Sequence, residues 1–186
     1  MKYYVVADVH GFCSILKDTL KEKGFFDDEE PHKLIVCGDL FDRGSEAVEL
    51  QNFILELIEK DEVILIKGNH EELLVDMLNS WHRASYLESH HNSNGTVDTV
   101  LQLTGTRLAD LYDNPSDIYH KMKETPFMQK ILPAMVDYFE KENHIFVHGW
   151  IPCESIRQNP YAVTYFAIDD WRNASVKQWS SARWIN

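Results

Sequence analysis

Three short apolar runs, each followed at once by a polar cluster, constrain the fold of this chain more than any other feature. The runs cover residues 3–7, 33–37 and 63–66. Runs of this kind are typical of strands buried on both faces of a parallel sheet. Between them, residues 14–23 and 46–59 repeat Leu, Ile, Val and Phe at three- and four-residue spacing, as amphipathic helices do. The sequence therefore predicts an α/β fold with a βαβαβ core.

The rest of the chain adds further elements to this core. We expect a helix from Glu71 to about Trp81 and a polar, mostly helical insertion over about 83–130. Residues 135–140 and 144–148 are predicted to form a β-hairpin, and the tail after residue 152 a partly helical segment. Together these elements predict a mixed sheet or sheet sandwich flanked by helices, within one domain over 1–186 of the 186 residues.

The polar clusters should meet in space although they are distant in sequence. Right-handed crossovers make consecutive strands parallel, so their carboxyl ends share one edge of the sheet, where open α/β sheets bind ligands. The clusters are Asp8-Val9-His10-Gly11, Gly38-Asp39-Leu40-Phe41-Asp42-Arg43-Gly44, Gly68-Asn69-His70-Glu71 and, after the predicted hairpin, His148-Gly149-Trp150. Carboxylate, imidazole and amide oxygen together suit Mn²⁺, Fe²⁺ or Zn²⁺. The sequence therefore predicts a divalent metal site at this edge.

The ordered set DxH, GDxxDRG, GNHE and HG, spread over residues 8–150, resembles the metallophosphoesterase superfamily. The full DRG and GNHE forms resemble its phosphoprotein phosphatase branch, the PPP-type serine/threonine phosphatases. The resemblance implies a calcineurin-like metallophosphoesterase domain that hydrolyses a phosphomonoester, with phosphoserine or phosphothreonine as candidates, by attack of a hydroxide bridging two metal ions. A dinucleoside polyphosphate hydrolase is the alternative, because such enzymes share much of the motif set.

The same resemblance implies a role for each potential metal ligand. Asp8 and His10 would hold the first ion, and Asp39 would bridge both ions. Asn69 and His148 would hold the second. We expect Mn²⁺ in both sites, with iron or zinc as alternatives.

The resemblance also implies an acid and a phosphate clamp. His70 would protonate the leaving group, with Asp42 orienting its imidazole. Arg43 would bind the phosphate through its planar, charged fork. The family commonly uses a second arginine downstream; Arg183 is the first candidate and Arg172 the next.

One motif of the family is missing. A later Gly-His pair completes the second metal site in the family, but this chain has no histidine after His148 and stops at Asn186. We therefore expect a C-terminally incomplete chain with a weaker second site. A non-catalytic metal-binding domain stays open as an alternative, and so does a dimer that covers an apolar sheet edge exposed by the missing strands.

Charge and cysteine content narrow the partners and the compartment. The formal net charge is −12 without a basic stripe, which disfavours nucleic acid; the expected partner is a phosphorylated protein or small molecule. Cys13, Cys37 and Cys153 form no CxxC pair, so neither a disulfide framework nor a zinc knuckle is predicted. With no apolar run long enough to cross a membrane, we expect a cytoplasmic protein.

The adjacent pair His90-His91 attracts attention as a metal site. Neighbouring residues point apart on a helix or strand, and the surrounding Ser and Asn favour turns. The sequence therefore gives no reason to assign a metal to this pair.

Overall fold

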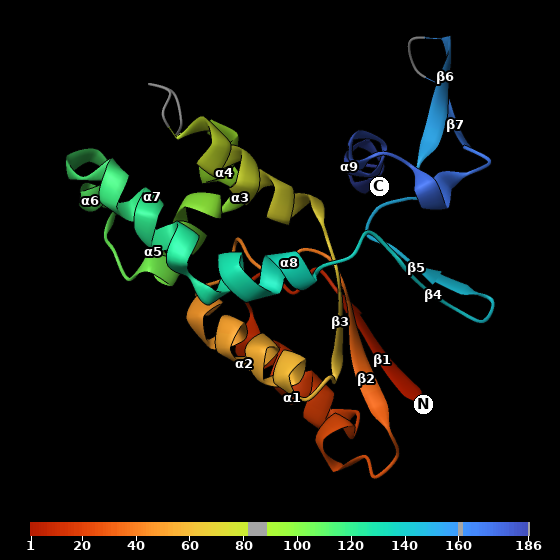
Figure 1. Cartoon of the computed structure of the whole chain (residues 1–186), viewed down its shortest axis with the longest axis horizontal. Helices are drawn as coiled ribbons and strands as arrows, with labels where there is room; N and C mark the ends of the chain where they lie inside the picture. The colour runs from red at the N-terminus through yellow and green to blue at the C-terminus, as the bar shows by residue number, and fades with distance from the viewer. Residues whose placement is uncertain (82–88, 160–161, 186) are drawn as a thin grey trace.

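The structure, a computed structural model, describes residues 1–81, 89–159 and 162–185. At its centre lies a three-stranded sheet of β1 (Lys2–Ala7), β2 (His32–Cys37) and β3 (Val63–Ile66), in the order β1-β2-β3 (Figure 1). All neighbours in this sheet are parallel, as the sequence predicts. The register puts Ala7 beside Cys37 and Cys37 beside Ile66, so the three strands end side by side.

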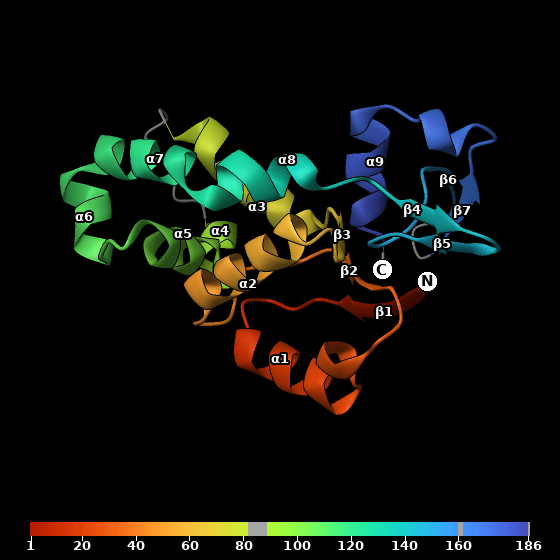
Figure 2. The same cartoon turned by 60° about the horizontal axis from the view of Figure 1, so that its bottom comes forward.

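Both faces of this sheet are covered, and the strands contribute alternate residues to each. Leu34 and Val36 join the main core with the helices α1 (Cys13–Glu22) and α2 (Ala47–Glu59), which begin and end within one residue of the predicted ranges. Ile35 and Cys37 face the opposite side, where they pack with aromatic side chains of the hairpin described below. Figure 2 shows that this hairpin and α2 lie on opposite sides of the sheet.

The helix α3 (Asn69–Ser80) begins two residues earlier than predicted and places Asn69 and His70 in its first turn. Helices then follow one another, which confirms the helical character of 83–130 wherever the structure describes it. These elements are α4 (Ser89–Asn94), α5 (Thr96–Thr104), α6 (Leu108–Asp113), α7 (Pro115–Glu124), the π-helical turn η2 (Phe127–Ile131) and α8 (Leu132–Ala134). A short 3₁₀ turn, η1 (Phe25–Asp27), lies earlier in the chain, between α1 and β2. The part of the predicted insertion at 83–88 lies outside the described residues.

The predicted hairpin exists, but it is shorter than expected. It consists of β4 (Phe139–Lys141) and β5 (His144–Phe146), paired antiparallel. The residues before β4 leave the hairpin because Val136 pairs in parallel with β3: its N–H donates to Leu65 O at 2.9 Å, and Val136 O accepts from Lys67 N–H at 2.9 Å.

The tail contains an element that the sequence analysis did not predict. A second antiparallel hairpin, β6 (Cys153–Asn159) with β7 (Ala162–Ala167), precedes the expected helical part. That part is the 3₁₀ turn η3 (Trp171–Asn173) and the helix α9 (Val176–Arg183). Within the described ranges, no helix combines the length and apolarity needed to cross a bilayer.

Candidate active site

The polar clusters meet at the carboxyl edge of the central sheet, as predicted from the strand order. Backbone hydrogen bonds join the loops: His10 N–H donates to Asp39 O at 2.9 Å, and Gly44 N–H donates to His10 O at 2.8 Å. Asp39 follows β2 directly and is 3% exposed. The loops after β1 and β2 therefore form one hydrogen-bonded unit around a buried carboxylate.

His10 is oriented so that one ring nitrogen faces this carboxylate. Its Nδ1–H donates to Phe41 O at 3.0 Å, so Nε2 presents a lone pair. That nitrogen is buried and has no hydrogen-bond partner among the residues that the structure describes. It lies 3.8 Å from Asp39 Oδ2 and 3.9 Å from Asp8 Oδ1. Burial lowers the pKa of His10, which keeps the imidazole neutral, as a cation ligand must be.

His148 reaches the same edge from the segment after β5. Its Nδ1–H donates to the carbonyl oxygen of Cys37 at 2.9 Å, so its Nε2 also presents a lone pair. This nitrogen lies 2.7 Å from Asn69 Oδ1 and 3.5 Å from Asp39 Oδ1. Nε2 of a neutral His148 and the amide oxygen of Asn69 are both donor atoms that a cation can share. The donor set therefore fits a second cation.

Asp39 belongs to both groups of potential ligands. One group joins it to His10 and His70, the other to Asp8 and His148, with the ligand atoms of each group within 4.8 Å of one another. The structure thus brings together all five residues predicted to bind metal, including Asn69 next to His148. Carboxylate, imidazole and amide donors sharing one aspartate suit a pair of borderline divalent ions.

Asp42 and His70, the predicted acid pair, are in direct contact. His70 Nδ1–H donates to Asp42 Oδ2 at 2.8 Å, and the side chains of His70 and Asp42 are 3% and 1% exposed. Burial works to lower the pKa of His70, but the bond to Asp42 and the negative charge of Asp39 raise it above its ordinary value overall. A histidine held in this way can carry a proton near neutral pH.

Arg43 lies at the mouth of the site, exposed to solvent. Its Nη2–H donates to His70 Nε2 at 3.1 Å. Because a guanidinium only donates, Nε2 must accept in this arrangement, and the imidazole proton stays on Nδ1. Protonation of Nε2 requires the guanidinium to turn away, for instance toward an incoming anion.

Two threonines of α5 complete the surroundings of Asp42, and the sequence analysis missed both. Thr96 Oγ1–H donates to Asp42 Oδ2 and Thr99 Oγ1–H to Asp42 Oδ1, each at 2.8 Å. Asp42 N–H donates in turn to Thr99 Oγ1 at 3.0 Å. A Cβ on Gly95, just before α5, would lie 2.4 Å from Arg43 N. Only glycine therefore lets the start of α5 come this close to the loop after β2. No motif marks these threonines in the sequence.

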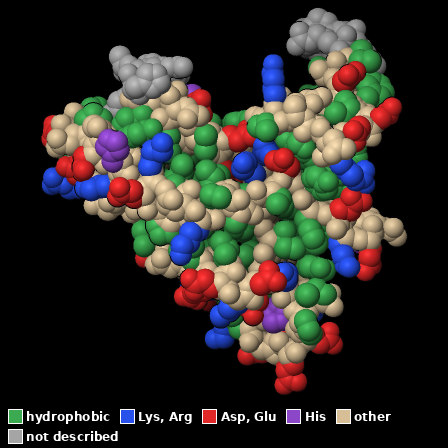
Figure 3. Space-filling view, viewed as in Figure 1, with side chains coloured by type: hydrophobic (Ala, Val, Ile, Leu, Met, Phe, Trp, Pro, Cys, Tyr) green, Lys and Arg blue, Asp and Glu red, His purple; other side chains and the backbone are tan. Residues whose placement is uncertain are grey.

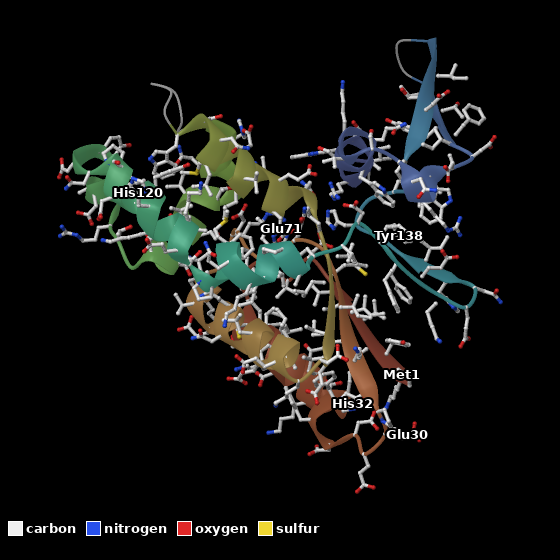
Figure 4. The ribbon with its side chains drawn as sticks, in the orientation of Figure 1. Met1, Glu30, His32, Glu71, His120 and Tyr138 are labelled. Atoms are coloured by element: carbon white, nitrogen blue, oxygen red, sulfur yellow. The ribbon has the colours of Figure 1, made fainter. Side chains whose placement is uncertain are left out.

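Glu71 is a further residue to which the sequence analysis gave no role. Its carboxylate accepts from the N–H groups of Gly68, Asp39 and Leu40 at 2.7, 3.1 and 2.9 Å, and thereby ties the loop after β3 to the loop after β2. Burial, followed by the charge of Asp39, raises the pKa of Glu71 to about 7. Figure 4 labels it at the base of α3. Its place three residues after Gly68, the spacing of a helix N-cap and N3, is a signal that could have identified it.

The two candidate downstream arginines are both engaged with protein carboxylates. Arg183 is 2% exposed; its guanidinium pairs with Glu72 and Asp137, and its Nε–H donates to Lys67 O at 3.1 Å. Arg172 forms a two-point pair with Glu140 at 2.8 Å on both contacts. Binding of phosphate by Arg183 stays a prediction, and it would require these bonds to be exchanged.

Two hollows border the site. One of about 460 Å³ is lined by Asp8, Cys37, His148 and Trp150, among others. The other, about 360 Å³, lies between Arg43 and one side of α5, where Asp98 and Leu101 line it. Burial, followed by the charge of Asp8, raises the pKa of the Cys37 thiol to about 11, so it stays protonated and is a poor nucleophile.

Comparisons with known proteins place this arrangement among phosphoesterases. A "Serine/threonine-protein phosphatase 1" of Salmonella typhimurium is 34% identical over 73 residues, which is 39% of this chain and 31% of the relative. A "Bis(5'-nucleosyl)-tetraphosphatase PrpE [asymmetrical]" of Bacillus subtilis is 30% identical over 76 residues, 38% of this chain and 31% of the relative. The matched segment thus spans about a third of each of these curated relatives.

A solved structure, described as a mutant of a cold-active protein tyrosine phosphatase, shares the fold. It covers 81% of this chain and 44% of that chain, with a TM-score of 0.51 and 20% sequence identity. The calcineurin-like phosphoesterase family matches residues 1–177, which include every motif of the site. On this match, the chain belongs to the calcineurin-like phosphoesterase family.

Proposed function

We propose that this chain is a metal-dependent phosphoesterase that hydrolyses a phosphomonoester with two divalent ions. The observation that carries the proposal is the position of Asp39, whose Oδ2 lies 3.8 Å from His10 Nε2 and whose Oδ1 lies 3.5 Å from His148 Nε2. The Asp42–His70 pair lies next to it, with His70 Nε2 3.9 Å from Asp39 Oδ2. Candidate metal ligands and a candidate proton donor thus surround one buried carboxylate.

The side chains divide the work. Asp8, His10 and Asp39 would hold one ion, and Asp39, Asn69 and His148 the other. When bound, the ions supply Lewis acidity: they lower the pKa of water to about 7 and neutralise charge on phosphate oxygens.

The proton and phosphate steps belong to the residues beside the ligands. Arg43 would leave His70 Nε2 to bind two phosphate oxygens. His70, held by Asp42, would then take up a proton on Nε2 from solvent and give that proton to the leaving oxygen. The exchange couples substrate binding to protonation, since the guanidinium blocks that nitrogen until an anion draws it away.

Phosphoserine or phosphothreonine in a protein is the substrate class we favour. It follows from the DRG and GNHE forms and from similarity to a chain named as a serine/threonine-protein phosphatase. A dinucleoside polyphosphate is the second candidate, because other similar proteins are named bis(5'-nucleosyl)-tetraphosphatases. Product analysis with a phosphopeptide and with diadenosine tetraphosphate separates the two.

The proposal is tested by hydrolysis of an aryl phosphate with and without Mn²⁺. Activity should require metal and disappear in Asp39→Asn and His70→Asn. Asp117→Asn is a matched control, because this carboxylate lies on α7 and pairs with Lys121. Metal-independent turnover that survives the two site variants would reject the proposal. Metal binding without turnover in the unsubstituted chain would favour a non-catalytic metal-binding domain.

Three finer assignments belong to the same proposal. Mn²⁺ is the ion we favour, because the donors are carboxylate, imidazole and amide. The cysteines are free, which suits a reducing cytoplasm. The net charge of −12 argues against nucleic acid as a partner, and Figure 3 shows basic and acidic side chains interspersed on the face that it draws. The phosphorylated partner follows from the phosphatase names of the similar proteins. Activity measured across a series of metals tests the choice of Mn²⁺, cell fractionation tests the compartment, and titration with nucleic acid tests the partner. Sedimentation tests the dimer that the sequence analysis left open.

A further inference from the structure

A second histidine cluster lies away from the candidate active site, where α4 packs against α3 (Figure 1). It consists of Asp76 on α3 with His90 and His91 on α4, and one ligand atom from each lies within 4.8 Å of the others. Asp76 is about two helical turns beyond His70, a separation of roughly 9 Å along the helix at about 1.5 Å per residue. None of the three residues contributes to the site described above.

The distances are close to those of a metal centre. Asp76 Oδ2 lies 3.4 Å from His91 Nε2 and 3.9 Å from His90 Nε2. Ligands bound at about 2.0–2.1 Å to a tetrahedral ion lie about 3.3–3.4 Å from one another. The ligand atoms of His90 and His91 lie within 4.8 Å of each other, so the triangle closes if His90 moves inward.

The two histidines converge although they are adjacent in the sequence. Their ring centroids are 4.0 Å apart, with the ring planes at 51°. The expectation that neighbouring residues point apart, which argued against a metal here, is therefore wrong for these side chains. A single histidine would be enough for an ion pair with Asp76; the convergence of two is what a metal requires.

Burial differs across the cluster in the way a three-ligand site needs. The His91 side chain is 0% exposed, whereas those of His90 and Asp76 are 42% and 60% exposed. One side is packed between the helices and the other faces solvent. A water molecule can reach the fourth ligand position from that side.

We propose that Asp76, His90 and His91 bind a further divalent ion of the zinc class, separate from the pair at Asp39. Two imidazole nitrogens and one carboxylate oxygen form a donor set common for Zn²⁺, with water completing the tetrahedron. The proposal does not depend on the function of the chain, because it uses no residue of the candidate active site.

The position suggests what such an ion does. The helix α3 begins with Asn69 and His70, whereas α4 leads through Gly95 into α5, which holds Asp42 by Thr96. An ion that joins α3 to α4 would hold α3, which carries His70, in a fixed position relative to α5, which holds Asp42. This makes the ion a structural brace.

Zinc stoichiometry tests the proposal. The full chain is equilibrated with Zn²⁺ and desalted, and the bound metal is counted in the unsubstituted protein, Asp76→Asn and His90→Gln. Both positions are partly exposed, so these variants should fold; replacement of the fully buried His91 is avoided. His120→Gln is the control, since this exposed histidine, labelled in Figure 4, lies on α7 and is not one of the three proposed ligands.

The unsubstituted chain and His120→Gln should each hold one zinc equivalent more than Asp76→Asn or His90→Gln. Affinity for that equivalent should fall more than about tenfold in both variants, since even outer-shell changes cost about 10- to 100-fold. The rise in melting temperature on adding Zn²⁺ should shrink in parallel. Equal zinc content in all four proteins overturns the proposal. Loss in His90→Gln alone also overturns it, because it would indicate binding by exposed imidazole without Asp76.

Discussion

Replacing Thr99 by valine removes a hydroxyl with two separate functions at Asp42. That hydroxyl donates to Asp42 Oδ1 at 2.8 Å and accepts from the Asp42 N–H at 3.0 Å. Among the described residues, the Thr96 hydroxyl makes one hydrogen bond, to Oδ2, and this oxygen also accepts from His70. Valine has almost the shape of threonine, so neither substitution should leave a cavity. The two variants therefore differ in the hydrogen bonds lost.

The magnitudes follow from these bonds. A hydrogen bond to a charged group contributes about 1.5–3 kcal/mol, and a typical neutral one about 0.5–1.5 kcal/mol. Asp42 is 1% exposed, so water cannot replace either bond. Thr99→Val should lower the free energy of unfolding by about 2–4 kcal/mol. Thr96→Val should cost about 1–2 kcal/mol, since His70 still satisfies Oδ2.

The assay combines urea unfolding with steady-state hydrolysis of an aryl phosphate. A general acid contributes about 10²–10⁴-fold, so loss of its orientation in Thr99→Val should lower kcat about tenfold or more with little change in KM. Thr99→Ser, which keeps the hydroxyl, should recover most of both losses. Thr104→Val is the control on the same helix, because its hydroxyl bonds Val100 O at 2.7 Å and lies outside the site. If Thr96→Val were as damaging as Thr99→Val, or if neither exceeded the control, the assignment of these threonines to Asp42 would be refuted.

Three further outcomes are expected. Gly38→Ala should weaken metal binding and stability, because its Cβ would lie 2.5 Å from the Nδ1 of His148; metal titration checks this. Glu71→Gln should destabilise the fold by about 2–3 kcal/mol in thermal unfolding. The two carboxylate oxygens of Glu71 accept three N–H bonds, whereas glutamine offers one oxygen and puts an NH₂ group in place of the other. Lys2, 2.7 Å away, holds the pKa of Asp28 well below its usual range. The ion pair of Asp28 with Lys2 therefore stabilises the fold above pH about 4, and this contribution is lost in more acid solution. Asp28→Asn should reduce the fall of the unfolding free energy at acid pH.

The periodic part of the fold could be predicted because periodicity reports burial. The runs at 3–7, 33–37 and 63–66 and the helices between them are buried on regular faces, so their patterns are clear. The hairpin of β6 and β7 escaped prediction because its residues carry no such signal. Ile156 and Phe166 are 56% and 52% exposed, so apolar and polar residues do not alternate between a core and a solvent face.

The candidate site could be predicted only where residue type and strand position agree. Asp39 and His148 follow strands, and the parallel register of the central sheet brings its strand ends together. Thr96 and Thr99 lie in a helix outside the motifs and act only through Asp42, so their role depends on how α5 packs. Tertiary packing of this kind leaves no local pattern.

The backbone gives an independent reason to regard these residues as a functional unit. Asp8, His10, Asp39, Asp42 and Arg43 all have positive φ, between 50° and 73°, although none is glycine. Left-handed backbone costs an L-residue about 1–2 kcal/mol, so five such residues in two loops strain the fold considerably. A glycine at any of these positions would relieve that strain, but it would remove a ligand, the acid pair or the guanidinium. The strain thus lies at the residues that bear the candidate chemistry. This is expected when these positions are occupied for the function of their side chains and not for the stability of the loops.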